Sequence, residues 1–129
     1  MHILYYGIPK NEGGQGIRKA VESVIPIQDL EVYRSLERLF ERLRRTPGDR
    51  YGIAVFLIQD NEELFALLDA GDLWGRLKIV LVLNDPDEET ISLGHALYPR
   101  YVAYASSEFR DVRAVLGKML QQAHENRDT

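Results

Sequence analysis

The chain contains no cysteine, so neither a disulfide framework nor thiolate chemistry is available to it. This absence fits a reducing compartment, and we expect a cytoplasmic protein. No apolar run approaches the roughly 18 residues that a membrane-spanning helix needs, so we expect no contact with a membrane. The segment from Met1 to Tyr6 lacks a basic leader and is apolar almost at once, so we expect no signal peptide.

Histidine is scarce, and positive charge is in the minority. The three histidines, His2, His95 and His124, fall on different predicted elements, and no pair has the spacing of metal ligands. We therefore expect no metal site.

Acidic residues outnumber basic ones by 20 to 16, and the net charge of −4 argues against general affinity for nucleic acid.

What the chain does have is five short apolar runs that alternate with five amphipathic runs. The predicted strands are Ile3–Tyr6, Leu30–Tyr33, Ile53–Ile58, Ile79–Leu83 and Tyr101–Ala105. Most of these runs are free of charge, which is typical of parallel strands that helices cover on both faces. The chain length predicts one α/β domain over residues 1–124, and we expect residues 125–129 to fray at the end of the last helix.

Five strand–helix units in a chain of this length resemble the flavodoxin-like group, whose parallel sheet has the order 2-1-3-4-5. Within that group the chain most resembles the receiver domain of bacterial two-component response regulators. The resemblance rests on the order and lengths of the elements, on Leu30–Leu43 as strand then helix, and on Leu77–Leu120 as strand, helix, strand and long final helix. It implies a three-layer (βα)5 sandwich of the CheY and flavodoxin type.

The residues with which a typical receiver accepts a phosphoryl group do not carry over to this chain. Where a typical receiver has its acidic pair, this chain has Gly7–Pro9, and where it has the acceptor aspartate, this chain has Phe56–Ile58. The position of the family's hydroxyl residue holds Leu83–Asn84, and that of its lysine holds Ala105–Ser107. Metal-assisted phosphoryl transfer needs carboxylates that hold the cation and a cation that offsets the phosphate charge. The resemblance therefore implies a degenerate receiver, or pseudo-receiver, with no catalytic residue, no expected phospho-acceptor and no cofactor.

In parallel α/β sheets ligands bind at the carboxyl ends of the strands, so polar residues there are candidates for a binding site. Asp60 follows the third strand and is a weak candidate acceptor; the favoured alternative makes it the N-cap of the next helix, with Glu63 completing a capping box. Gly13, Gly14 and Gly16 open the first helix and could hold a phosphate against backbone N–H groups, but a flexible turn is the favoured interpretation.

Asn84, Asp85, Ser106 and Ser107 would line the same crevice, although Asp85 and the two serines are also good helix caps. The candidate ligand-binding residues are therefore Gly13, Gly14, Gly16, Asp60, Asn84 and Ser106.

Two surfaces are candidates for contacts with other proteins. Arginines gather on the second predicted helix, where a solvated face paired with local glutamates is favoured over a docking site; they are Arg38, Arg42, Arg44 and Arg45. A second set surrounds the fourth helix and fifth strand; it consists of His95, Tyr98, Tyr101 and Tyr104. Tyrosine suits interfaces because an apolar ring carries a polar tip, and covering the sheet edge is the alternative role.

Two hypotheses follow. The first is a stand-alone, non-catalytic signalling module that contacts protein partners. In receivers the face formed by the fourth helix, fifth strand and fifth helix commonly mediates dimers. The resemblance therefore implies a homodimer through that face. The second is a small ligand-binding protein or enzyme that uses the glycine-rich loop with Asp60, Asn84 and Ser106. A binding protein needs a pocket with converging polar groups, whereas a pseudo-receiver should fill that region with Ile8, Pro9 and apolar neighbours.

Overall fold

The fold is a five-stranded parallel sheet with the order β2-β1-β3-β4-β5. It was obtained as a computed structural model, which describes residues 2–7, 12–45, 51–73, 77–83, 87–104 and 109–127. The strands are His2–Tyr6 (β1), Leu30–Tyr33 (β2), Tyr51–Ile58 (β3), Lys78–Leu83 (β4) and Tyr101–Tyr104 (β5). The predicted α/β class, strand positions and sheet order are therefore confirmed, with small differences at the strand ends.

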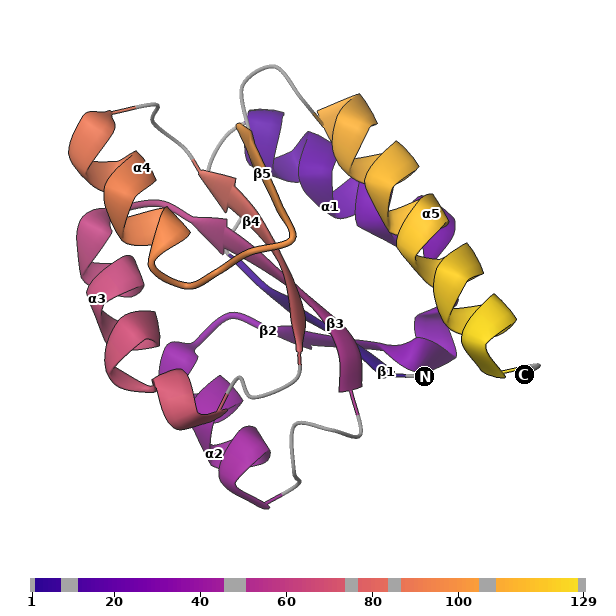
Figure 1. Ribbon diagram of the computed structural model, residues 1–129, viewed down its shortest axis with the longest axis horizontal. Coiled ribbons are helices and arrows are strands. Elements are labelled where there is room, and N and C mark those ends of the chain that lie inside the picture. The colour runs from indigo at the N-terminus through magenta and orange to yellow at the C-terminus, as the bar shows by residue number, and fades with distance from the viewer. Residues whose placement is uncertain are drawn as a thin grey trace.

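Helices form a layer on each face of the sheet (Figure 1). They are Glu12–Val24 (α1), Leu36–Arg45 (α2), Asn61–Asp69 (α3), Glu88–His95 (α4) and Phe109–Arg127 (α5). Helices α1 and α5 cover one face, and α2, α3 and α4 cover the other (Figure 1). Helix α5 continues to Arg127, into the segment that we expected to fray. None of the helices in the described ranges is long and apolar enough to cross a membrane.

Two apolar cores lie on opposite faces of the sheet because successive strand residues point to opposite sides. On the side of α3, Leu4 and Phe56 are fully buried, and on the side of α1 the same holds for Tyr5 and Val55. The central strand β3 is buried from Ile53 to Ile58, which explains its continuous apolar run. The carboxyl ends of the strands consequently rest on closely packed apolar layers.

The start of α4 differs from the prediction. We expected Asp85 to cap this helix and Pro86 to open it, but the helix begins at Glu88 and Asp87 is its N-cap, without a side-chain cap hydrogen bond. Glu88 and Glu89 lie in the first turn, where the helix dipole favours negative charge. The interpretation of Asp85 as the cap was therefore wrong.

Candidate functional site

The ends of β1 and β3 meet at Gly7 and Leu57. Tyr6 pairs with Phe56 in the sheet, and the N–H of Gly7 donates a 3.1 Å hydrogen bond to the carbonyl of Tyr33 on β2. Gly7 is buried, Leu57 is fully buried, and a Cβ built on Gly7 would lie 2.6 Å from the Cβ of Leu57. The position directly after β1 therefore has no room for a side chain of any kind, and its neighbour on β3 is apolar.

Asp60 lies at the start of α3, where its carboxylate accepts a 3.0 Å hydrogen bond from the N–H of Glu63. The carboxylate of Glu63 accepts a 2.8 Å hydrogen bond from the N–H of Gln59 and another from the hydroxyl of Tyr6. Burial, followed by this hydrogen bond to Glu63, raises the pKa of Tyr6. The predicted capping role of Asp60 is confirmed, but Glu63 bonds to Gln59 where the standard capping box would use Asp60 itself.

A second polar contact links α3 to α4. The hydroxyl of Thr90 donates a 2.7 Å hydrogen bond to the side-chain oxygen of Asn61, and Thr90 is buried. Satisfying a buried hydroxyl in this way avoids the cost of leaving it unpaired. Together with the cap at Asp60, this contact gives the polar side chains beyond β3 structural roles.

The structure describes four of the six predicted ligand-binding residues. Gly13, Gly14 and Gly16 lie within α1 and are helical, so they do not form the loop that the sequence suggested. Asp60 follows β3 and is the N-cap of α3. Asn84 and Ser106 lie outside the described residues, as do Ile8 and Pro9, which were expected to fill the crevice. In the described part of the chain, no three His, Cys, Asp or Glu side chains are arranged to hold a metal ion.

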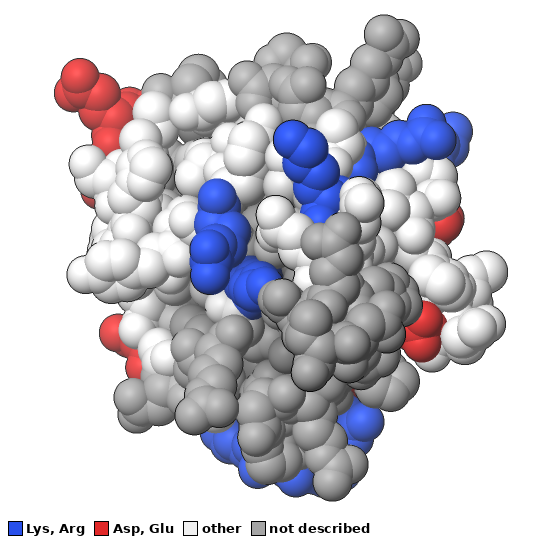
Figure 2. Space-filling view, turned by 45° about the vertical axis from the view of Figure 1, so that its right-hand side comes forward, with Lys and Arg blue, Asp and Glu red and all other residues white. Residues whose placement is uncertain are grey.

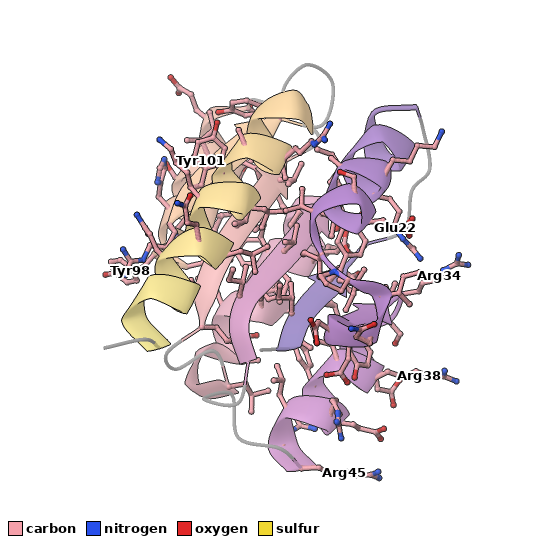
Figure 3. All side chains as sticks on the ribbon, turned by 90° about the vertical axis from the view of Figure 1, so that its right-hand side faces the viewer. Glu22, Arg34, Arg38, Arg45, Tyr98 and Tyr101 are labelled. Atoms are coloured by element: carbon pink, nitrogen blue, oxygen red, sulfur yellow. The ribbon has the colours of Figure 1, made fainter. Side chains whose placement is uncertain are left out.

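The four predicted interface residues lie along the connection from α4 to β5 and on β5 itself. His95 ends α4, and Tyr101 and Tyr104 lie on β5, the edge strand beside β4. Tyr98 is 90% exposed and has a φ of 53°, a left-handed conformation that a bulky side chain rarely adopts. Figure 3 shows Tyr98 and Tyr101 on the same side of the molecule.

The arginines of α2 are exposed to solvent. Arg38 and Arg45 are exposed and extend away from the protein in Figure 3. Arg42 pairs at 3.3 Å with Glu31 of β2, a partner outside its own helix that the sequence did not suggest. An exposed pair of this kind adds little stability. The arginine cluster therefore resembles a solvated helix face, which agrees with the favoured interpretation.

Sequence reasoning missed a groove between α1 and α5. It is lined by Gly16, Lys19, Ala20, Ser23, Val24, Arg113, Ala114 and Gly117 and has a volume of about 890 Å³. The available signal was the pairing of small residues on two helices, Gly16 with Ala20 and Ala114 with Gly117. That spacing alone did not show that the two helices are neighbours.

Removing the cap of α3 provides a direct test of the role of Asp60. Asp60→Ala is expected to lower the free energy of unfolding by about 1 kcal/mol, because the N–H of Glu63 loses its acceptor. The matched control is Glu62→Ala in the same exposed turn, which should change stability by less than about 0.5 kcal/mol. Urea unfolding followed by circular dichroism measures both, and equal effects would contradict the capping role.

Comparison with known proteins supports the fold. No family model matches the chain, and no curated protein matches it. A CheY-like response regulator from Mesorhizobium loti has a TM-score of 0.64 at 13% identity, covering 92% of this chain and 97% of that one. A Burkholderia pseudomallei protein described as pilus assembly-related has a TM-score of 0.62 at 22% identity, covering 95% of this chain and 90% of that one.

A third structure, the phosphorylated cyanobacterial phytochrome response regulator RcpA, has a TM-score of 0.57 at 14% identity and covers 92% of this chain and 91% of that one. Sequence identities this low show similarity of fold. The chain therefore has a receiver-like fold, in agreement with the order and lengths of its predicted elements.

Proposed function

We propose that this protein is a non-catalytic signalling module of the cytoplasm, a degenerate receiver that acts through protein contacts and has lost phosphoryl transfer. The main support is the contact between Gly7 and Leu57. A Cβ on Gly7 would lie 2.6 Å from that of Leu57, which leaves no space for a cation-binding carboxylate directly after β1. Leu57, at the adjacent position of β3, is fully buried and offers no acceptor oxygen.

Two described carboxylates lie just beyond β3, and both are engaged: Asp60 accepts from the N–H of Glu63, and Glu63 accepts from Gln59 and Tyr6, which supports the same conclusion. Incubation with acetyl phosphate and Mg²⁺ is therefore expected to leave the intact mass unchanged. An authentic receiver domain treated in parallel serves as the positive control. A phosphoryl adduct that disappears in Asp60→Asn would overturn the proposal, since it would make Asp60 an acceptor despite its capping role.

We place the main contact surface at the α4–β5–α5 face. Tyr98 combines a nearly complete exposure of its ring with a strained backbone, and strain of this kind is concentrated at functional positions. The strand β5 has β4 on one side and forms an edge of the sheet. An edge strand bordered by tyrosines is a suitable place for a second protein to add contacts. We propose that this face forms a homodimer or receives a protein partner.

Sedimentation equilibrium tests the homodimer. Tyr98→Ala and Tyr101→Ala are each expected to weaken self-association about tenfold or more, because buried tyrosines are frequent hot spots. Phe65→Ala is the control, since Phe65 is 50% exposed and lies on α3. A protein that stays monomeric at high concentration, or a dimer that Tyr101→Ala leaves unchanged, would contradict this assignment.

A further inference from the structure

The groove between α1 and α5 has a lining that suits close approach by another helix. The two helices lie side by side on the same face of the sheet (Figures 1 and 3). Small residues line both sides of the groove: Gly16 and Ala20 belong to α1, and Ala114 and Gly117 belong to α5. Small side chains allow helix axes to approach closely, because the distance between packed helices depends on the residues at the contact.

Gly117 has no evident role within the fold. A Cβ built on it would meet no atom within 4 Å, whereas a Cβ on Gly7 or Gly94 would collide with a leucine. Glycine inside a helix is less stable than alanine, so a glycine that no neighbour requires weakens α5 without benefit to the isolated chain. The empty space above Gly117 is instead explained if the groove receives a side chain or backbone from outside.

The basic side chains around the groove indicate what kind of partner it can bind. Lys19 of α1 and Arg113 of α5 are exposed, and neither forms an ion pair with the side chains that the structure describes. Arg18, by contrast, is paired with Glu22 at 2.6 Å, and Figure 3 shows Glu22 on the side of α1 away from α5. Among the coloured atoms of Figure 2, basic side chains lie over the middle, the upper right and the lower edge of the view, and acidic ones lie toward its left and right sides.

These cations argue against a second copy of the chain as the occupant. A symmetric dimer would use the same patch on both copies, so two sets of Lys19 and Arg113 would be brought into one interface. Like charges across an interface are costly, whereas carboxylates at the same positions would be attracted. The charge pattern therefore favours a partner that brings negative charge to both rims.

From these observations we infer that the α1–α5 groove is a docking site for an acidic amphipathic helix of a protein partner. The apolar side of that helix packs on Ala20, Ala114 and Gly117, and its carboxylates pair with Lys19 and Arg113. This site shares helix α5 with the α4–β5–α5 face but is completed by α1, and it does not depend on the loss of phosphoryl transfer.

The test uses a synthetic helical peptide of about 18 residues, long enough to span the groove, with an alanine and leucine face flanked by glutamates. A matched peptide carries lysine in place of every glutamate. Titrated into ¹⁵N-labelled protein, the glutamate peptide is expected to shift the amide signals of α1 and α5, and the lysine peptide to leave them unchanged. Equal binding of the two peptides, binding of neither, or shifts confined to α4 and β5 would overturn the inference.

Variants of the protein then test where the glutamate peptide binds. A Cβ at position 117 meets no atom within 4 Å, so Gly117→Leu is expected to retain the parent circular dichroism spectrum and to weaken peptide binding about tenfold or more. Lys19→Glu combined with Arg113→Glu should reverse the preference in favour of the lysine peptide. The pair Arg34→Glu and Arg38→Glu changes the net charge equally at another surface (Figure 3) and should leave binding unchanged.

Two outcomes would contradict this location. Full binding by Gly117→Leu would exclude the groove as the docking site. A self-associated protein that Gly117→Leu converts to monomer in sedimentation equilibrium would show that a second copy occupies the groove, and the acidic partner would be excluded.

Discussion

Leu57→Asp is expected to abolish stable folding, even though it introduces the residue type with which a typical receiver ends its third strand. Leu57 is fully buried, and removing a leucine side chain from such a site costs about 2–5 kcal/mol. The new carboxylate adds a second cost, because an unpaired charge in an apolar layer is strongly unfavourable. The sum is comparable with the entire stability of a typical domain, about 5–15 kcal/mol.

Urea unfolding followed by circular dichroism measures this effect. The matched control is Phe65→Asp, which places the same carboxylate on a side chain that is 50% exposed and should change stability by less than about 1 kcal/mol. If Leu57→Asp keeps a stability within about 1 kcal/mol of the parent, the carboxyl end of β3 must be open to water. That result would remove the main support for the loss of phosphoryl transfer.

Gly7→Ala is expected to lower the free energy of unfolding by about 2–3 kcal/mol, at the upper end of the range for overpacked cores. The cause is steric, because the added methyl group would lie 2.6 Å from the Cβ of Leu57 and the φ of Gly7 lies outside the left-handed region. The Cβ of Leu57 is fixed by the backbone of β3 and cannot rotate away. Leu57→Ala keeps this Cβ and should therefore leave the shortest contact in place, so Gly7→Ala should remain destabilising in the Leu57→Ala background.

Gly94 provides the matched control for this prediction. A Cβ on Gly94 would lie 2.7 Å from the Cδ2 of Leu81, the far end of a flexible side chain. Gly94→Ala should therefore cost less than about 1 kcal/mol, since the leucine can turn and the helix gains from alanine. Thermal or urea unfolding of both variants compares them, and equal losses would show that the contact between Gly7 and Leu57 is less rigid than its geometry implies.

The parts of this structure that could be predicted from sequence are those encoded by local patterns. The uncharged runs of β3 and β4 are continuous because both faces of these strands are buried, so the runs themselves identify the strands. Asp60 and Glu63 could be assigned to a helix start because the capping interaction spans three residues of one segment. Neither inference required knowledge of which segments meet in space.

The remaining features depend on contacts between distant residues or on competition between similar local signals. The hydroxyl of Tyr6 donates a hydrogen bond to Glu63, which is 57 residues away in the sequence, and no local sequence pattern near either residue predicts this contact. Asp85 and Asp87 are equally suitable caps, and the structure places the cap at Asp87. The α1–α5 groove exists because two helices far apart in the chain lie on the same face of the sheet.

The position of β1 between β2 and β3 affects how the chain must be made. During synthesis the first strand can pair with β2 early, but its other edge waits until Ile58 has been added and β3 is complete. Until then the apolar strand from Ile3 to Tyr6 presents unpaired backbone groups to other nascent chains, which is a route to aggregation. The interval between these two pairings is therefore a period in which this edge of β1 is open to pairing with another chain.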